Sequence, residues 1–569
     1  MSAAQHYLNY GADLGRNPGP KFDTNYYLER YPDVAKTGQN ALVHFETIGR
    51  AEGRFPSPQA EAGQGDVLAR IDRMASDLWG GLAGKAFAQL QAFAECETSD
   101  REARVRAYCE LAIWSHFEAD HVAALRFLET AGILYAGDEE QRRLMLLAML
   151  HFDQNRSKNA ADALEGCSES NHVLLALANL VDGQERLGMI SEVLKQADLV
   201  PVGLQDSNSP ASLTNLSAKA TPVKSDGRVS VIMPAHNAEG TIRAALQSLL
   251  AQSYEDLEIF VVDDASTDGT VEVVSDLMAS DARVRLIRQE TNTGAYPARN
   301  RALADISGQF ITTHDADDWS HPQKIEVQVS ALGHDQKLQA TVSSWSRVRP
   351  DMTLTSNWRL DHRLIQLNHS SFMFRKSVVD QLGAWDDVRV SADTEFMWRV
   401  QAAFASASVR SVLPHIPLSF ALDDSNSLTR TKATHVCTMF HGLRHIYREV
   451  SRHWHQCVPN GLTMKQNAHK RSMLPREILS NPDDGRKEPQ VWLVGDGCDE
   501  QVIQRMLRFA RSNPAQEIAV CHSPDPEFAG RIYGFAAEFP ELFFALLGLE
   551  NVQYTTSPPP DAPGKQLYY

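Results

Sequence analysis

The sequence of 569 residues contains no long hydrophobic run, no basic block and no cluster of cysteines. Its longest apolar stretches, LMLLAML and FFALLGL, fall well short of the roughly 20 residues that a membrane-spanning helix needs. Because 72 acidic residues outnumber 55 Lys and Arg, giving a formal charge of −17, nucleic-acid binding through phosphate neutralisation is disfavoured. The seven cysteines lack CxxC and zinc-ligand spacings, which is typical of a reducing compartment rather than of a disulfide framework.

Two phosphate-binding motifs and a signal-peptide pattern are also missing. There is no GxxxxGK[ST] loop, which disfavours an ATPase or kinase, and no GxGxxG follows the first strand of the α/β region, which disfavours a dinucleotide-binding enzyme. The first residues do not have the pattern of a secretory signal. We therefore expect a cytoplasmic protein with no membrane anchor of its own and with roughly two to four domains.

The first 58 residues contain a repeat. The segments HYLNYGADLGRNPGP and HFETIGRAEGRFPSP share His, Gly, Arg and Pro at one spacing. Each unit is expected to be two short helices closed by a Gly-Arg-x-Pro turn, with a core of Tyr26, Tyr27, Leu28 and Phe45. The unit resembles a short tyrosine-rich module found beside bacterial polysaccharide glycosyltransferases, and we favour a packing or spacer role for it.

Residues 59–202 have the apolar periodicity of α-helices. Small–large–small triplets, which let a partner helix approach closely, recur at equal separation: Ala86/Leu90/Ala94, Ala123/Phe127/Ala131 and Ala160/Leu164/Ser168. The pattern favours a solenoid similar to tetratricopeptide repeats, with a plain helical bundle as the alternative. In either case we expect a scaffold or a surface for a protein partner. The polar, aperiodic segment 203–228 is expected to be a linker.

From residue 229 the apolar strands VSVIMPAH, LEIFVVDD, VRLIRQ and QFITTHD alternate with amphipathic helices. This alternation predicts a parallel sheet covered on both faces, and ligands of such sheets bind beyond the carboxyl ends of the strands. A single polar residue at a strand end is commonly a helix cap or turn former, but several at one edge indicate a site. The residues in question are His236, Asn237, Asp263, Asp264 and Asp315.

Three carboxylates, those of Asp315, Asp317 and Asp318, crowd into four positions after the fourth of these strands. Like charges this close repel each other, and a divalent cation between them relieves the repulsion. Mg²⁺ and Mn²⁺ prefer oxygen ligands, commonly one or two carboxylates together with phosphate oxygens of a substrate. The cluster therefore predicts a metal–diphosphate site.

Six segments resemble, in order and spacing, the motifs of family 2 glycosyltransferases: VSVIMPAHNAEGTI, VVDDASTDGT, NTGAYPARNRAL, HDADDWSHP, HSSFMFRKSVVDQLGAWDD and SADTEFMWRV. The resemblance covers about residues 229–430 and implies the GT-A fold, an α/β, Rossmann-like and mostly parallel arrangement. It also implies inverting transfer of a sugar from a nucleotide-diphosphate donor, expected to be a UDP-sugar, with Mn²⁺ or Mg²⁺ as cofactor. The acceptor would be a hydroxyl of a glycan, glycoconjugate or lipid-linked sugar in bacterial surface polysaccharide assembly, which allows peripheral location at the inner membrane face.

The resemblance implies a donor site drawn from four segments: Pro234, Ala235, His236, Asn237, Asp263, Asp264, Gly294, Arg299, Asn300 and Asp315. Within it, Asp264 would accept a hydrogen bond from uridine N3–H, and Asp263 would support that loop. The cation would be held by Asp315, Asp317 and Asp318. Asp317 is the first candidate for direct contact, and Asp318 is the alternative because the register within the acidic run is ambiguous.

The resemblance also implies that Asp393 is the general base that removes the proton of the acceptor hydroxyl. Ala392 stands where many members carry Glu, so Glu395 is kept as an alternative base. The acceptor side would be bordered by His369, Ser370, Arg375 and Trp385. Two rival interpretations stay open, namely a non-catalytic scaffold that binds nucleotide sugar or glycan, and a nucleotidyltransferase.

Beyond residue 432 the resemblance ends. A helical segment and a small α/β lobe are expected next, and then a flexible tail. The expected divisions of the chain are 1–58, 59–202, 203–228, 229–432, 433–556 and 557–569.

Overall fold

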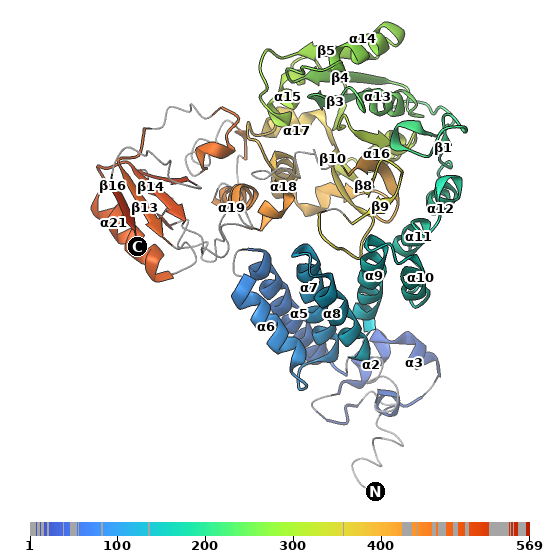
Figure 1. Cartoon of the computed structure of the whole chain (residues 1–569), viewed down its shortest axis with the longest axis vertical. Coiled ribbons are helices and arrows are strands. Elements are labelled where there is room, and N and C mark those ends of the chain that lie inside the picture. Colours follow the sequence, from blue (N-terminus) through green and yellow to red (C-terminus); the bar gives the residue numbers. More distant parts are fainter. Residues whose placement is uncertain are drawn as a thin grey trace. The chain divides into compact units, whose positions relative to one another are not determined.

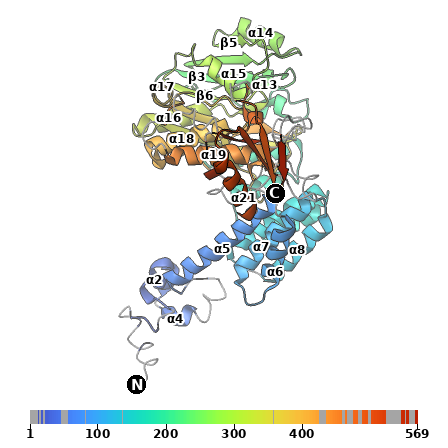
Figure 2. The same ribbon diagram turned by 90° about the vertical axis from the view of Figure 1, so that its left-hand side faces the viewer.

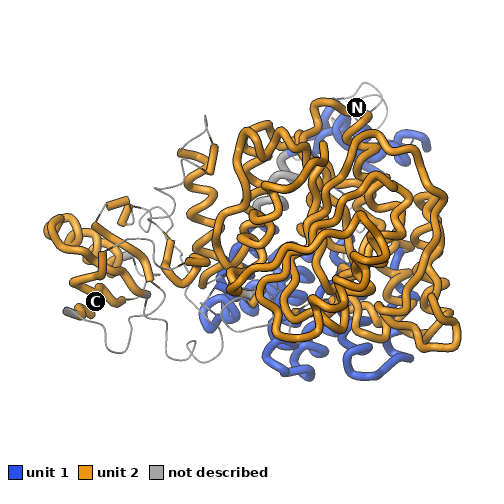
Figure 3. The backbone as a smooth tube through the Cα atoms, turned by 90° about the horizontal axis from the view of Figure 1, so that it is seen from above, with its two compact units in different colours: residues 1–168, 359–362 blue, residues 169–358, 363–569 orange. Residues whose placement is uncertain are grey.

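The structure is a computed structural model of the chain (Figures 1 and 2). Apart from a few single residues, it describes residues 16–19, 22–37, 39–45, 56–80, 83–134, 137–356, 358–423, 435–440, 442–457, 462–464, 474–481, 487–495, 500–522, 551–555 and 565–568. The chain divides into two compact units, residues 1–168 with 359–362 and residues 169–358 with 363–569 (Figure 3).

Unit 1 begins with three short helices, α2 (Thr24–Arg30), α3 (Pro32–Thr37) and α4 (Ala41–His44). Asp23 caps α2 by accepting from the Tyr26 amide at 3.0 Å, which satisfies a donor that the helix itself cannot pair. Tyr27 and Phe45, both predicted as core, are buried, and the Tyr27 hydroxyl lies 3.0 Å from His44 Nδ1. The repeat glycines at 11, 15, 49 and 53 lie outside the described residues.

The rest of unit 1 is helical, as predicted, with consecutive helices packed on one another: α5 (Pro58–Trp79), α6 (Ala83–Glu95), α7 (Arg101–Phe117), α8 (His121–Leu134), α9 (Gly137–Asp153) and α10 (Ser157–Glu165). Figure 2 shows α5 alongside α7, with which it is in contact. The small–large–small triplets form buried helix faces with two exceptions. Ala123 is only half-buried, and Ser168 is exposed because α10 ends at Glu165.

Helices α11 (Asn171–Ala178) and α12 (Gly183–Lys195) belong to unit 2, so the predicted helical region 59–202 is divided between the two units near residue 168. The side-chain amide of Asn179 donates to the Leu354 carbonyl and accepts from the Leu354 backbone N–H, both at 2.8 Å. Arg186 donates to the Asp351 carbonyl at 2.8 Å. These bonds tie α11 and α12 to the α/β core. Sequence periodicity identified the helices but not the unit they pack on.

The segment 203–228 was expected to be a linker, and this expectation is wrong in part. It contains the paired strands β1 (Gly203–Leu204) and β2 (Leu216–Ser217) and a 3₁₀ turn, η3 (Leu213–Asn215). The amide of Val223 donates to the Ser253 carbonyl at 2.9 Å, and the Tyr254 hydroxyl donates to the Gly227 carbonyl. Buried Leu213 and Leu216 supply the apolar contacts that the polar composition conceals.

A ten-stranded mixed sheet forms the centre of unit 2, with main order β5-β4-β3-β6-β10-β8-β12-β7. Its first four members are parallel, as predicted: β5 (Val284–Arg288), β4 (Leu257–Asp263), β3 (Val229–Ala235) and β6 (Phe310–Thr313). The other half is mixed because β10 (Gln366–Arg375) runs antiparallel to β6 and β8. The remaining strands are β8 (Ala340–Val348), β12 (Pro417–Leu422), β7 (Asp318–Ser320), β9 (Leu354–Thr355) and β11 (Val409–Ser411).

Helices cover both faces of the central sheet, so the α/β class is confirmed (Figure 1). Val229, Val231 and Met233 of β3 pack on one face with α13 (Ile242–Leu250), α14 (Thr270–Ser280) and α16 (Lys324–His334). Ile232 faces the opposite side, where α15 (Ala295–Ala302), α17 (Lys376–Leu382), α18 (Ala392–Phe404) and α19 (Gly442–Cys457) pack. This alternation follows from the two-residue period of a strand.

The predicted small α/β lobe is present as a four-stranded parallel sheet of order β15-β14-β13-β16. It comprises β13 (Val491–Gly495), α21 (Glu500–Ser512), β14 (Ile518–His522), β15 (Val552–Thr555) and β16 (Lys565–Tyr568). Because β16 pairs with β13, the expectation of a flexible tail is wrong for residues 565–568. Within the described parts of the chain, no helix is long and apolar enough to cross a membrane.

Candidate active site

The loops that follow β3 and β4 are fastened to each other at the carboxyl edge of the sheet. His236 donates from Nδ1 to the Asp264 carbonyl at 2.9 Å, since a carbonyl oxygen can only accept. The Asn237 amide donates to the Ser266 hydroxyl at 3.0 Å, and the Asn237 side-chain oxygen accepts from Thr267 at 2.8 Å. Pro234 and Ala235 end β3 beneath this pair of loops. Hydrogen bonds to the loop after β4 therefore hold the turn at residues 234–237, which was predicted to lie under a nucleotide base.

Asp264 supports the neighbouring loop. Its two carboxylate oxygens accept from the amides of Thr293 and Gly294, both at 2.8 Å, and only 3% of the residue is exposed. Gly294 has φ +94°, a conformation that residues with a Cβ rarely adopt, and it begins α15. Asp263 is also buried and accepts from the Ser266 amide at 3.2 Å. Both acids thus brace the loops, a role that the sequence assigned to Asp263 alone.

Arg299 on α15 is the centre of the charged cluster. Its guanidinium is buried, donates from Nη2 to Asp315 Oδ1 at 3.0 Å, and lies over the rings of Tyr296 and Trp385 at 5.3 and 6.0 Å. Its Nε and Nη1 are buried and have no hydrogen-bond partner among the described residues. Buried donors of this kind normally have an acceptor, so the cluster suits an anionic ligand. Asn300 on the same helix donates to Asp387 and to the Trp385 carbonyl, both at 2.9 Å.

The three acids after β6 differ in environment. Asp315 accepts from the Ser370 hydroxyl and, like Asp317, is half-buried at the edge of the sheet. Asp318 is buried in β7, and burial together with the charges of Asp317 and Asp315 raises its pKa well above its usual value. Lys324 nearby is also buried, which lowers its pKa to about 8. Asp318 is therefore the least suited of the three to reach a substrate-bound cation.

These residues fit a cation that is shared with a substrate. In the described part of the chain, no three His, Cys, Asp or Glu side chains form a metal cluster. Asp315 and Asp317 nevertheless offer carboxylate oxygens at one edge, next to a buried arginine with unpartnered donors. A site with one or two carboxylates is the usual arrangement for Mg²⁺ when substrate phosphates complete the coordination.

Asp393 lies in the first turn of α18 and faces the same cluster. The turn is entered through Ser391 at φ +60°, and the Asp393 carboxylate accepts from the Thr394 amide at 2.6 Å. Burial opposes ionisation of Asp393, but the charges of His369 and Arg299 and the Thr394 bond outweigh it, so its pKa lies below its usual value. His369 comes from β10 next to a register shift that follows Asn368. Burial lowers the pKa of His369.

Glu395, the alternative base, is not at this cluster. It is 1% exposed and lies 3.2 Å from Arg399 Nε and 2.9 Å from His455 Nε2. Residues two apart on a helix point in different directions, which separates Glu395 from Asp393. The structure gives Glu395 a buried ion-pair role and leaves no path for an acceptor hydroxyl.

Two residues predicted for the acceptor side have other positions. Arg375 pairs with Phe310 at the amino end of β6 and donates to the carbonyls of Leu332 and Leu338 at 2.6 and 2.9 Å. Because β10 is antiparallel to β6, the five residue steps from Ser370 to Arg375 lead away from the carboxyl edge by at most roughly 17 Å. Trp385 is 4% exposed and packs against Phe374 and Phe396, so its ring supports Arg299 instead of facing an acceptor.

Sequence reasoning missed three residues of the cluster. Tyr296 is buried, and burial together with the Asp393 charge raises its pKa. Arg444 and Arg448 come from α19, outside every recognised motif, and their charges also act on Asp393. The repeated spacing of Arg444, Arg448 and Arg452 in GLRHIYREVSRHW was a detectable signal, because residues four apart share a helix face.

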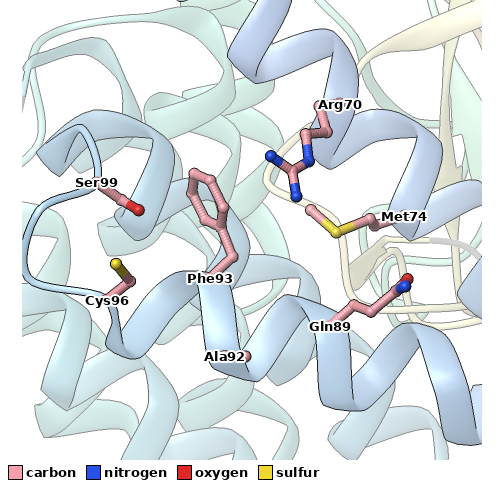
Figure 4. A pocket seen from close by; sticks show the side chains of 7 residues that line it. All are labelled: Arg70, Met74, Gln89, Ala92, Phe93, Cys96 and Ser99. Atoms are coloured by element: carbon pink, nitrogen blue, oxygen red, sulfur yellow. The ribbon is translucent and has the colours of Figure 1, made fainter.

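A separate pocket of about 470 Å³ lies between α5 and α6 of unit 1 (Figure 4). Hydrogen bonds from Thr98 and Ser99 lower the pKa of Cys96 to about 7. The pocket offers no carboxylate or imidazole for acid–base chemistry or cation binding. Its lining residues are Arg70, Met74, Gln89, Ala92, Phe93, Cys96 and Ser99.

The cluster lies on and next to a segment that matches a known family. Residues 230–388 match the family model of glycosyl transferase family 2. They are a family 2 glycosyltransferase domain. Asp315, Arg299 and His369 lie within the matched part of the domain, whereas Asp393 follows it and Arg444 is distant in sequence.

Curated relatives match the glycosyltransferase domain over short stretches. An Escherichia coli protein named UDP-Glc:alpha-D-GlcNAc-diphosphoundecaprenol beta-1,3-glucosyltransferase WfgD is 45% identical over 107 residues, 19% of this chain and 42% of that protein. An uncharacterized glycosyltransferase of Haemophilus influenzae is 38% identical over 104 residues, 18% and 42% of the two chains. The chain spans less than half the length of the curated relatives that it matches.

Solved structures also resemble the glycosyltransferase domain weakly. S. aureus TarS 1–349 in complex with UDP-GlcNAc has 16% identity and a TM-score of 0.32, covering 57% of this chain and 89% of that one. Mannosyltransferase PcManGT from Pyrobaculum calidifontis has 17% identity and a TM-score of 0.30, covering 52% and 77%. These TM-scores are too low to assign a ligand to this chain.

Proposed function

We propose that the protein is a metal-dependent, inverting glycosyltransferase that uses a UDP-sugar. The observation that carries the proposal is the position of Arg299. It is hydrogen-bonded to Asp315 at the acidic edge, and its charge also acts on Asp393. Both observations support a single cluster that holds the proposed cation ligands and the proposed base, as transfer between two substrates requires.

Asp393 is the proposed general base. Its pKa is held below the usual value, so it is ionised at neutral pH and can accept the proton of an acceptor hydroxyl as that hydroxyl attacks the sugar C1. The attack comes from the side opposite the leaving nucleotide diphosphate, which inverts the configuration at C1 without a covalent intermediate. The half-buried position of Asp393 limits competition from water.

Asp317 and Asp315 are the proposed cation ligands, with Asp317 in direct contact. A bound Mn²⁺ or Mg²⁺ would act as a Lewis acid for charge on the leaving diphosphate. Arg299 holds Asp315 in place and has two further donors without a described partner, to which a phosphate oxygen would be a suitable acceptor. Ser370 fixes the second oxygen of Asp315.

The choice of UDP rests on the resemblance of the donor loops and on the name of the E. coli relative, which specifies UDP-Glc. The acceptor is proposed to be a hydroxyl of a glycan or glycoconjugate in bacterial surface polysaccharide assembly. A cytoplasmic location, peripheral attachment to the membrane and a protein partner for the helical region remain predictions of the sequence.

The deciding experiment measures nucleotide release from a panel of nucleotide sugars with Mn²⁺. We expect UDP to be released from at least one UDP-sugar and the release to stop in EDTA. A matched pair of variants, Asp393→Asn and Asp276→Asn, tests the base, because the Asp276 side chain on α14 is 74% exposed and pairs only at the surface. Pyrophosphate release would instead identify a nucleotidyltransferase, and UDP binding without any release would identify a non-catalytic binder.

A further inference from the structure

Helix α19 lies beside α18 (Figure 1). Its sequence carries a row of arginines. Arg444, Arg448 and Arg452 are four residues apart and so share one face of the helix. Arg444 donates to the Ser391 hydroxyl at 3.4 Å, immediately before the turn that carries Asp393. Arg448 and Arg452 lie over the Trp398 ring of α18 at 5.0 and 4.5 Å.

Buried contacts fix this row relative to the base. His455 of α19 lies 2.9 Å from Glu395 of α18, and the Tyr447 hydroxyl donates to Asp386 at 3.3 Å. Both Tyr447 and Glu395 are almost fully buried. The arginines are thus held at a defined position beside α18, unlike long side chains on a free surface.

Several positively charged groups gather around Asp393. Arg299, Arg444 and Arg448 all act on this carboxylate, and His369 adds a titratable group. Arg448 is half-buried and forms no ion pair with any carboxylate that the structure describes. Burial and the neighbouring charges of Arg452 and Arg444 lower the pKa of Arg448. Arg452, by contrast, is exposed and paired with Glu449.

We infer that Arg444 and Arg448 bind a phosphate group carried by the acceptor. This inference rests on the proposed function. The donor diphosphate is assigned to the acidic edge, where Arg299 has its own unpartnered donors. Arg444 instead bonds to Ser391, two residues before Asp393. The charges of Arg444 and Arg448 act on Asp393, where the attacking hydroxyl must lie. The charge of Arg448 also acts on His369. A phosphate dianion beside two guanidinium groups forms charge-assisted hydrogen bonds.

The test uses phenyl phosphate as the probe, titrated into the full chain with saturating UDP and Mg²⁺. In Arg444→Gln/Arg448→Gln we expect the Kd for phenyl phosphate to rise about tenfold or more. The Kd for UDP should change less than about twofold if the two sites are separate. Arg452→Gln is the matched control on the same face and should leave both constants unchanged. Gln preserves helix propensity, and circular dichroism checks that the variants fold.

Three results would overturn the inference. The first is unchanged phenyl phosphate binding in the double variant, and the second is an equal loss of phenyl phosphate affinity in Arg452→Gln. The third is a parallel loss of UDP affinity in the double variant, which would make the arginines part of the donor site. If wild-type protein binds phenyl phosphate through these arginines but never binds UDP, the proposed function fails and the anion site stands. The phosphate could belong to a lipid-linked acceptor or to a soluble glycan, and comparing the Kd values of farnesyl diphosphate and glycerol phosphate distinguishes these two sources. Preference for farnesyl diphosphate indicates a lipid-linked acceptor, and equal affinity indicates a soluble phosphate-bearing glycan.

Discussion

Arg299 Nη2 and Asp315 Oδ1 are 3.0 Å apart, in a pair whose arginine side chain is only 4% exposed. The same guanidinium lies over two aromatic rings. A pair this enclosed depends on the planar fork of arginine, which lysine cannot reproduce.

Arg299→Lys is therefore expected to be far from conservative. The variant keeps the charge but loses the ring contacts and the donors that face the proposed diphosphate. We expect UDP affinity in the presence of Mn²⁺ to fall at least about tenfold, measured by calorimetry. Arg301→Lys is the control. Arg301 lies on the same helix, two residues after Arg299, and pairs with Asp305 at the surface. Wild-type affinity in Arg299→Lys would remove Arg299 from the donor site.

Asp393→Asn is expected to reduce sugar transfer by about 10²–10⁴-fold while UDP binding is retained, because only the proton acceptor is lost. Initial rates at saturating donor, together with UDP calorimetry, distinguish chemistry from binding. Turnover close to wild type would place the base on another residue.

The lowered pKa of Asp393 also predicts how stability depends on pH. A carboxyl group whose pKa is lower in the folded state stabilises the protein above its unfolded pKa of about 3.9 and loses that contribution as pH falls through the folded value. The free energy of unfolding of the wild type should therefore exceed that of Asp393→Asn at pH 6, and the difference should shrink toward pH 3. Urea titrations at both pH values measure it; a difference that grows on acidification would contradict the sign.

Glu395→Gln tests the corrected role of the second acid. Removing its charge leaves Arg399, which is fully buried, without its ion-pair partner, and we expect a loss of about 3–5 kcal/mol in the free energy of unfolding. Glu449→Gln, whose partner Arg452 is exposed, should lose less than about 1 kcal/mol. The amount of folded Glu395→Gln is measured by titrating its UDP sites. Turnover per UDP site should match that of the wild type. A loss of turnover as large as in Asp393→Asn would restore Glu395 as a catalytic candidate.

Gly294→Ala isolates a backbone effect. A Cβ at this position would meet nothing within 4 Å, so any loss comes from the φ of +94°. We expect a cost of about 1–3 kcal/mol and a weaker hold of Asp264 on its loop, seen as reduced UDP affinity. Gly240→Ala, which also meets nothing within 4 Å and has no positive φ, should be nearly neutral. Equal effects of the two substitutions would rule out the conformational explanation.

The sequence predicted which residues lie at the carboxyl edge of the parallel strands, because strand ends and short motifs are local features. Parallel strands carry Asp264 and Asp315 to one edge whatever the rest of the chain does, and the motif order placed Ser370 and Asp393 beside them. Arg375 was misplaced because its motif spans a whole antiparallel strand, so neighbours in sequence reach opposite edges of the sheet. Direction of pairing is a tertiary property that the motif does not encode.

Other features depended on contacts between distant segments. Helices α11 and α12 look like the helices before them, and only their hydrogen bonds to residues near 351 and 354 assign them to unit 2. Arg444 is about fifty positions from Asp393 in sequence, and helix packing alone brings it close to Ser391. The polar composition of residues 203–228 likewise gave no sign of their hydrogen bonds to Ser253 and Tyr254.

The bond between His455 and Glu395 has a practical consequence for where this chain can be shortened. A chain ended at residue 432 would keep every recognised motif and still lack α19, the Ile478 carbonyl that accepts from Arg389, and the imidazole beside Glu395. Helix α18, which carries Asp393 in its first turn, would then lose the α19 partner of Glu395, the buried acid that pairs with Arg399. The smallest portion able to fold with an ordered base is thus longer than the family match, and its outer boundary is set by helix packing instead of by motif.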